Sequence, residues 1–242
     1  MTKIFSRLTL LAIGFLAFAG CKEDELTKVT IAYVTFVHAS PDAPKVDATV
    51  QNVPVGAALE FGKATPQTGL VRELGMQYKG TVKVNPAGAT LFTIDNPTWD
   101  DKKRYSMWVV DSAAKAKLIQ VEDIIDKVDT ASCLVRFVHA VPNAPNVDFR
   151  LGGTTTPFFA NVPFLGSEPA RGYTTYQKIY VGRMPAANPA KRQVFELLVA
   201  GGTDPVATAT IILNAGKAYT IWAKGFVGGT GTQVLGFGQV TH

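Results

Sequence analysis

The 242-residue sequence contains few of the residues that most often build reactive centres: only two cysteines and three histidines. Neither a Cys-x-x-Cys nor a His-x-x-x-His spacing occurs, so the short motifs of zinc and redox sites are absent. There is no Gly-x-Ser-x-Gly nucleophile elbow and no glycine-rich phosphate loop. We therefore predict no catalytic residue, no metal site and no cofactor, and we expect a chain that is not an enzyme.

The sequence also lacks a strong excess of one charge. The formal net charge is +5, with 24 basic and 19 acidic residues that alternate along the chain. Nucleic-acid binding surfaces need clustered basic residues on one face or stripe. We expect no nucleic-acid partner.

No apolar run is long enough to cross a membrane as a helix. The longest, Leu8–Ala19, is shorter than the roughly 20 residues that a bilayer core requires. Lys3 and Arg7 precede it, as in a secretory signal peptide. The run ends in Ala19-Gly20-Cys21, which resembles the lipobox of bacterial lipoproteins, although Phe18 stands where an aliphatic residue is usual. We predict a signal peptide over 1–20 and a membrane anchor through a lipid on Cys21; the alternative is ordinary cleavage without lipidation.

The residues directly after Cys21 form a charged tether, predicted to span 21–29. The stretch Lys22-Glu23-Asp24-Glu25 resembles a surface-export signal of some Gram-negative lipoproteins. We expect attachment to the outer membrane with exposure at the cell surface. A solvated linker without targeting information remains the simpler alternative.

A long internal repeat organises the rest of the chain. The segment Phe36–Asp47 returns as Phe137–Asp148 with nine of twelve positions identical. A second pair, Lys103–Trp108 and Lys217–Trp222, follows in the same order. A unit of about 100 residues is a duplicated domain rather than a solenoid repeat. We predict one domain over 30–128 and another over 131–242, joined by a charged linker at 122–130.

Each copy consists of short β-branched and aromatic runs separated by Pro, Gly, Asn and Asp, which is typical of β-sandwiches and barrels. Residues 119–128 come nearest to a helical pattern, and the glycine cluster at 225–231 is interpreted as a flexible hairpin tip. The remaining predicted strands are Thr81–Val84, Thr90–Ile94, Tyr105–Val110, Val194–Val199, Ala207–Leu213 and Tyr219–Ala223.

Alternation along these strands predicts which side chains face the core. Cys133, Val135 and Phe137 share the uncharged face of one strand, and Arg136 lies on the other. By the same reasoning Tyr105 and Tyr219 face their own cores, and the matched residues Trp108 and Trp222 point away from them. A tryptophan is costly to leave exposed, so we expect the neighbouring domain, a loop or a partner to cover each one.

The pattern His-Ala-x-Pro-[Asp/Asn]-Ala-Pro-x-Val-Asp, present in both copies, resembles the bacterial extracytoplasmic domain of unknown function 4397. Two later elements of the family pattern also fit: a Pro-Ala-Gly turn at 86–88 in the first copy, and an Ala-Gly-Lys-Ala-Tyr-Thr stretch at 215–220 in the second copy. The first copy departs from that stretch at the corresponding residues, 101–106. The resemblance implies two tandem immunoglobulin-like or related β-sandwich domains and a surface role. It implies no activity and transfers no catalytic residue.

The repeated motif contains residue types that also bind metals. A structural role is the favoured interpretation, because Asp or Asn between prolines usually bonds its own turn and the histidine can bond a turn carbonyl. A charged ligand is disfavoured further because the aspartate of the first copy is an asparagine in the second. The motif residues concerned are His38, Asp42, Asp47, His139, Asn143 and Asp148.

Aromatic residues in the connections are the remaining candidates for binding, because exposed rings stack on sugars and anchor protein interfaces. The alternative is that they fill the sandwich. The residues selected are Trp99, Phe158, Phe159, Tyr173 and Tyr176.

From these observations we expect a non-catalytic binding, adhesion or envelope-structural module that recognises a protein or a glycan. The alternative is an enzyme or accessory subunit of extracellular polymer processing, with paired carboxylates as the reactive groups. A cleft with converging carboxylates would favour the enzyme, and an apolar or aromatic patch would favour binding.

Overall fold

The computed structural model describes residues 29–73, 78–86, 88–95, 99–125, 127–128, 130–167, 177–180 and 190–242. The predicted signal peptide, most of the tether and Cys21 lie outside these residues. Within these residues, the regular structure is all β apart from two single-turn 3-10 helices, η1 (Ala113–Lys115) and η3 (Gly231–Gln233). None of the helical segments in the described ranges has the length or apolar character to span a bilayer.

The first eight strands form two four-stranded sheets. Their orders are β4-β1-β7-β8 and β3-β2-β5-β6, and β1 pairs with β7 in parallel while the other neighbours are antiparallel. The strands are β1 (Val29–His38), β2 (Val46–Val50), β3 (Val53–Leu59), β4 (Thr68–Glu73), β5 (Lys79–Val84), β6 (Thr90–Asp95), β7 (Arg104–Val110) and β8 (Lys117–Glu122).

The next eight strands repeat this topology. Their sheet orders are β12-β9-β15-β16 and β11-β10-β13-β14, again with one parallel pair, β9 with β15. The strands are β9 (Ser132–His139), β10 (Val147–Leu151), β11 (Phe159–Val162), β12 (Gln177–Tyr180), β13 (Ala190–Val199), β14 (Pro205–Asn214), β15 (Ala218–Lys224) and β16 (Gly236–Thr241). The two tandem β-sandwich domains expected from the repeat are therefore present.

Each sandwich has its own apolar core between its two sheets. In the first domain, Phe36 from β1, Val82 from β5 and Met107 from β7 meet in one buried cluster. In the second, Phe149 of β10 stacks on Phe137 of β9, with ring centroids 4.2 Å apart, inside the corresponding cluster. Alternation along each strand places these side chains on one face, as the sequence predicts.

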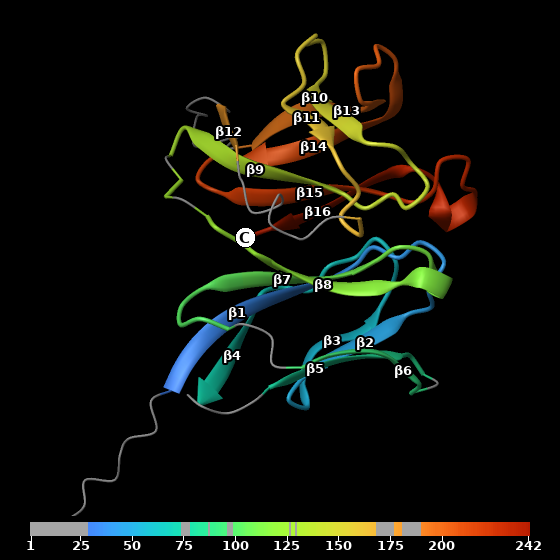
Figure 1. The fold of residues 1–242 in the computed structure, drawn as a ribbon. Coiled ribbons are helices and arrows are strands. Elements are labelled where there is room, and N and C mark those ends of the chain that lie inside the picture. The colour runs from blue at the N-terminus through green and yellow to red at the C-terminus, as the bar shows by residue number, and fades with distance from the viewer. Residues whose placement is uncertain are drawn as a thin grey trace, which may run out of the picture.

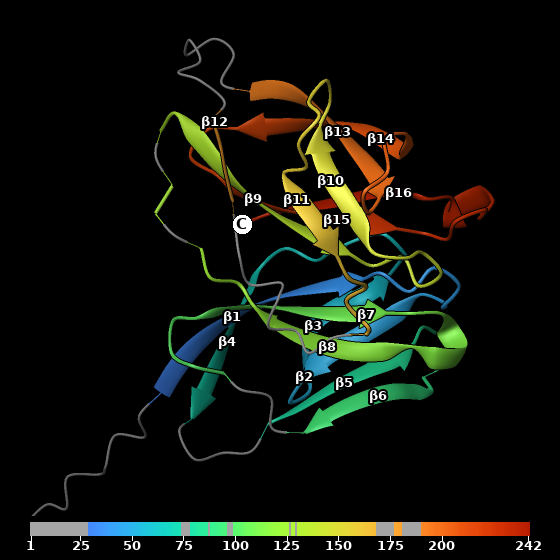
Figure 2. The ribbon, with the colours of Figure 1, turned by 45° about the horizontal axis from the view of Figure 1, so that its top comes forward.

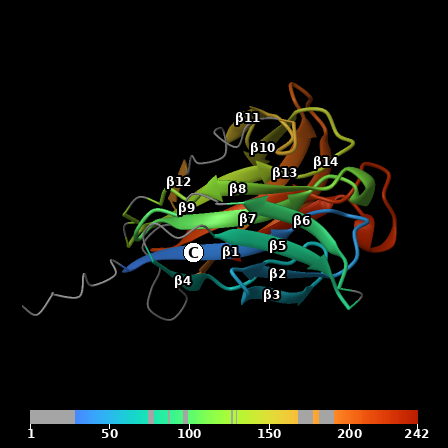
Figure 3. The ribbon, with the colours of Figure 1, turned by 60° about the horizontal axis from the view of Figure 1, so that its bottom comes forward.

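The two domains lie back to back, so that the molecule is a stack of four sheets (Figures 1 and 2). The two middle layers are β4-β1-β7-β8 and β12-β9-β15-β16, and Figure 3 shows β3 and β11 of the outer layers at opposite extremes of the stack. A third buried apolar cluster, with members from both domains, fills the contact between the middle layers. This contact is a full sheet-to-sheet packing rather than a touch between loops.

The strand-phase prediction for the tryptophans is confirmed. Tyr105 and Tyr219 belong to the two domain cores, whereas Trp108 and Trp222 belong to the cluster between the domains and are fully buried there. The neighbouring domain is what covers each indole.

One local prediction was wrong. Residues 117–122 form strand β8 instead of the start of a helical piece, because pairing with β7 outweighs a weak helical pattern. The glycine-rich segment 225–231 lies in the connection between the antiparallel strands β15 and β16, as expected of a hairpin tip. Phe226 N–H donates to the Gln233 carbonyl, Gly229 N–H donates to the Phe226 carbonyl, and η3 follows.

Candidate functional site

The two motif histidines are buried at the ends of β1 and β9 and bond turn carbonyls, as the sequence analysis expected. Nε2–H of His38 donates to the Pro44 carbonyl at 2.9 Å, and Nε2–H of His139 donates to the Pro145 carbonyl at 3.0 Å. Burial lowers the pKa of both, to about 4 for His139. Both imidazoles are therefore neutral near pH 7.

Asp42 and Asn143 do not bond their own turns; they reach a hairpin distant in sequence. Asp42 Oδ1 accepts the Ala113 N–H at 2.7 Å. Asn143 accepts the Val227 N–H at 2.9 Å and donates to the Val227 carbonyl at 3.0 Å. Each ties the motif loop to the hairpin that follows β7 or β15. Local spacing could not reveal this, because the partners are 71 and 84 residues away.

The final aspartate of each motif stabilises an irregular residue in the adjacent strand. Asp47 Oδ1 accepts the Ala58 N–H at 2.7 Å, and Asp148 Oδ1 accepts the Asn161 N–H at 2.6 Å. Ala58 and Asn161 have φ of 46° and 51°, a left-handed conformation that non-glycine residues rarely adopt. Bonds from Ala58 and Asn85 lower the pKa of Asp47. The carboxylates are thus engaged by backbone and amide donors.

The described residues of the motif and the core offer neither a metal site nor an activated nucleophile. Within the described ranges, no three His, Cys, Asp or Glu side chains are grouped so that they could hold a metal ion. Cys133 is buried in the second core, and burial raises the pKa of its thiol to about 11. A thiol in that state is a poor nucleophile at neutral pH.

Three of the five aromatic binding candidates lie in the described residues, and each is at least half-buried. Trp99 is only 4% exposed and packs edge to face on Tyr105, with centroids 5.2 Å apart. Phe158 and Phe159 are half-buried against the second core. Tyr173 and Tyr176 lie outside the described residues. Sequence alone could not assign Trp99 to the core, because no alternating apolar pattern surrounds it.

Trp99 nevertheless borders a cavity of about 220 Å³ in the first domain. The cavity lies where β1 and β4 approach the β2–β3 hairpin, and none of the residues that line it is charged. Its apolar wall includes Val50, Leu70, Tyr78 and Trp99, and its lining also includes Val53 and Val71, which are 49% and 66% exposed. The described part of the chain thus offers an aromatic-lined apolar recess beside exposed valines.

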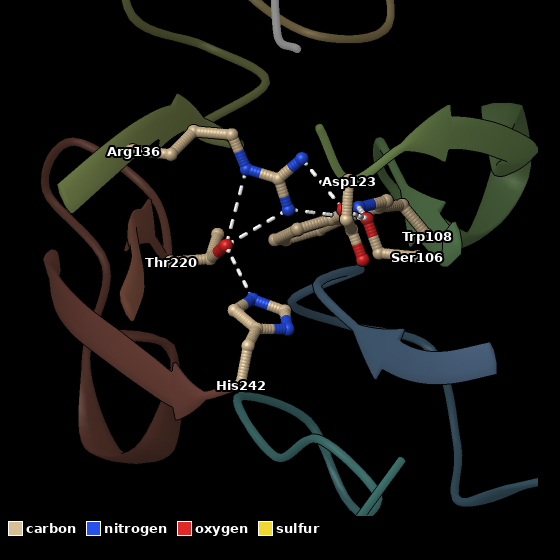
Figure 4. A network of polar contacts seen from close by, with 6 residues as sticks. All are labelled: Ser106, Trp108, Asp123, Arg136, Thr220 and His242. Carbon is tan, nitrogen blue, oxygen red and sulfur yellow. Dashed lines mark hydrogen bonds and ion pairs between the residues drawn. The ribbon is translucent and has the colours of Figure 1, made fainter. Parts of the chain in front are cut away.

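A second notable cluster is polar and lies between the domains (Figure 4). Arg136 Nη1 of β9 lies 2.7 Å from Asp123 Oδ1, just beyond β8, and both side chains are almost fully buried. The Ser106 hydroxyl donates to Asp123 Oδ1 at 2.9 Å and accepts the Trp108 indole N–H at 2.8 Å. Asp123 falls in the segment 122–130 that the sequence predicts to be a charged linker, but the structure buries it in the contact between the domains.

The second domain contributes Thr220 and His242 to the same cluster. Thr220 Oγ1 accepts from Nε and Nη2 of Arg136, at 3.1 and 2.8 Å, and lies 2.9 Å from His242 Nε2. Because the threonine oxygen already accepts twice, its hydroxyl proton points to the imidazole. Burial lowers the pKa of His242 to about 4, so this imidazole is neutral and can accept. The cluster is a closed structural network rather than an open reactive site.

The chain matches one protein family and shows distant structural similarity to solved proteins. A streptococcal virulence factor described as binding α-glucan is 11% identical, with a TM-score of 0.24; the match covers 79% of this chain and 92% of that one. A family 26 carbohydrate-binding module from Eubacterium rectale, solved with maltoheptaose, is 10% identical, with a TM-score of 0.23; the match covers 88% of this chain and 96% of that one. Likeness at this level says nothing about what this chain binds.

No curated protein matches the sequence. The family described as "Domain of unknown function (DUF4397)" matches it twice, over residues 32–150 and 133–236. These matches contain both copies of the histidine motif and nearly all strands of both sandwiches. The chain therefore belongs to the DUF4397 family, in two tandem copies.

Proposed function

We propose that this protein is a non-catalytic binding module, anchored at the cell surface through Cys21, that captures an apolar side chain of a protein partner in the cavity beside Trp99. The cavity is the observation that carries the proposal. A dry apolar cavity of about 150 Å³ suffices to hold benzene. The space of about 220 Å³ bordered by Trp99 and Tyr78 accommodates an aromatic or branched aliphatic side chain.

The chemistry of the lining favours a protein over a glycan. Sugar recognition combines a stacking ring with several polar groups that bond the hydroxyls. Apart from Trp99, this lining offers only the polar side-chain groups of Gln51 and Tyr78 and no charged residue. Trp99 is nearly buried and its ring packs on Tyr105, so it has no broad face open for a pyranose. Interfaces between proteins are anchored by apolar side chains that fill such recesses.

The same lining argues against the enzymatic alternative for this cavity. Hydrolysis by paired carboxylates needs two Asp or Glu side chains that converge on one bond. The cavity is lined by neither residue type. We therefore propose a binding role for it and not one in polymer cleavage.

The cavity can be tested on the mature chain carrying Cys21→Ala, with indole as the probe. Ligand-observed NMR should detect indole binding, and Val53→Arg should weaken it by placing a charge beside the recess. Val234→Arg is the matched control, because Val234 is 50% exposed and Val53 is 49% exposed. Absence of indole binding, or equal loss in both variants, would contradict the cavity. Binding of maltooligosaccharides in competition with indole would show that the partner is a glycan.

The cellular part of the proposal rests on the Ala19-Gly20-Cys21 junction and the charged residues behind it. Cys21→Ala should move the protein from the membrane fraction to the soluble fraction. Protease added to intact cells should digest the wild-type protein if it faces outward. A wild-type protein without an acyl group, or one protected in intact cells, would refute the anchor or the surface location respectively.

A further inference from the structure

Strand β14 is a sheet edge with unusual properties. It is ten residues long, ends the order β11-β10-β13-β14, and contains no charged residue. Its outward side chains include Val206 and Ile212, which are 49% and 45% exposed. Long uncharged edges invite pairing with another strand, and proteins usually protect them with charges, proline, bulges or short length.

The other edge strands of the described sheets carry such protection. Strands β11 and β12 have only four residues each, and β3 contains Pro54 and irregular pairing with β2. Strand β16 has two glycines in six residues. Charged residues lie within β4, β6 and β8. Strand β14 has only Pro205 and the irregularity at Val206, both at its start.

The free side of β14 has no partner among the described residues. Its one strand neighbour is β13, and no other backbone group of the described chain bonds residues 206–213. Unpaired N–H and C=O groups in a row form a template for a further strand. The pairing of β14 with β13 is regular from Ala207 to Asn214, and its one irregularity falls at Val206, next to Pro205.

The outward side chains of β14 are nearly self-complementary about Ala209. Thr208 corresponds to Thr210 and Val206 to Ile212, whereas the inward residues Ala207 and Ile211 differ in size. Antiparallel pairing of two copies about Ala209 would place threonine opposite threonine and valine opposite isoleucine on the exposed face. Cross-strand pairs of these types stabilise sheets, and no like charges meet.

From the free edge and this self-complementary pattern, we infer that β14 pairs antiparallel with β14 of a second copy of the chain. The occupant of the edge is thus another molecule of the same protein. The pairing joins two four-stranded sheets into one continuous sheet through backbone hydrogen bonds. The ion pair Arg150–Glu196 lies on β10 and β13, and Glu196 is the cross-strand neighbour of Thr208, so the pairing needs no rearrangement of that ion pair.

The test uses the mature chain with Cys21→Ala and measures mass by sedimentation equilibrium across a wide range of concentrations. The wild type should dimerise. Thr208→Lys/Thr210→Lys should be monomeric over the same range, because each lysine faces a lysine of the other copy. Thr208→Glu/Thr210→Glu should also be monomeric. An equimolar mixture of the two variants should recover the dimer, because opposite charges now face one another.

The control is Leu91→Lys/Thr93→Lys, which adds the same charges to exposed positions of the edge strand β6 and should leave the dimer intact. Three results would overturn the inference: a wild type that stays monomeric throughout, a β14 lysine variant that still dimerises, or a charge-swapped mixture that stays monomeric. If only the β6 variant lost the dimer, the dimer contact would lie in the first domain, and this result would also overturn the inference.

Discussion

Trp108 and Trp222, which hold equivalent positions in the two copies, pack edge to face on one another across the contact between the domains. Their ring centroids are 5.5 Å apart and their planes meet at 87°. Val37 and Val138, another equivalent pair, lie in the same cluster. Both domains therefore bury the same face, as the two subunits of a twofold-symmetric dimer do.

Trp108→Ala should lower the free energy of unfolding of the whole chain by about 3–5 kcal/mol, the usual cost of deleting a buried tryptophan. Urea denaturation measures it. Trp108→Phe is the conservative control and should cost less, because it keeps a ring against Trp222. Iodide should quench neither indole in the folded protein. A stability unchanged by Trp108→Ala would contradict the tight packing of the domains.

Arg136→Ala and Asp123→Ala should each lower stability by about 3–5 kcal/mol, because each leaves an unpaired charge in a buried site. The double variant Arg136→Met/Asp123→Leu should recover most of that loss, since it removes both charges and fills the volume. Urea unfolding of the wild type, Arg136→Met, Asp123→Leu and the combined variant forms a double-mutant cycle. Additive losses would show that the two side chains do not interact.

Stability should fall as the pH falls from about 6.5 toward 4. Burial disfavours the charged imidazolium, so the pKa of His139 and of His242 falls from the ordinary value of 6.5 to about 4 in the folded state. Between those values the unfolded state binds protons that the folded state does not, so acid favours unfolding. Each pKa unit of difference corresponds to about 1.4 kcal/mol.

His139→Gln tests the contribution of one of these histidines. The glutamine amide can still donate to the Pro145 carbonyl but does not titrate. The slope of stability against pH in this window should be shallower in the variant than in the wild type. Equal slopes would mean that His139 is already protonated in the folded protein.

Asn143→Asp should destabilise the protein by about 1–2 kcal/mol, because the carboxylate loses the donor to the Val227 carbonyl and repels that oxygen. Asp42→Asn should cost less, since its observed bond needs only an acceptor. Differential scanning calorimetry compares the two. Because Asp42 is engaged by a backbone N–H, EDTA should leave the melting temperature unchanged; a fall that calcium restores would assign a metal to this loop.

The strands and their inward faces were predictable because alternation is a local property of the sequence. Tyr105 and Tyr219 were assigned to the cores, and Trp108 and Trp222 to a covered outer face, from period-two spacing alone. The strand predictions at 81–84, 90–94, 105–110, 194–199, 207–213 and 219–223 all fall within observed strands. The ranges 30–128 and 131–242 for independently folding domains stay a prediction.

The candidate sites were less predictable because they depend on contacts between distant segments. In the sequence Asp123 lies in a charged segment between the copies, and only the packing of the second domain places Arg136 beside it. The role of Asn143 depends on a hairpin far along the chain. The cavity beside Trp99 combines residues from several strands, and no spacing in the sequence joins them.

The buried ion pair makes the face between the domains selective. In strand register, Thr35 is the counterpart of Arg136, and His242 is the counterpart of Asp123. If two first domains met through this face, Asp123 would lie opposite Thr35 and its carboxylate would be buried without a cationic partner. If two second domains met, Arg136 would be buried without a carboxylate partner. The face between the domains therefore favours a first domain paired with a second domain over two like domains, so the duplicated copies have become unequal and complementary halves.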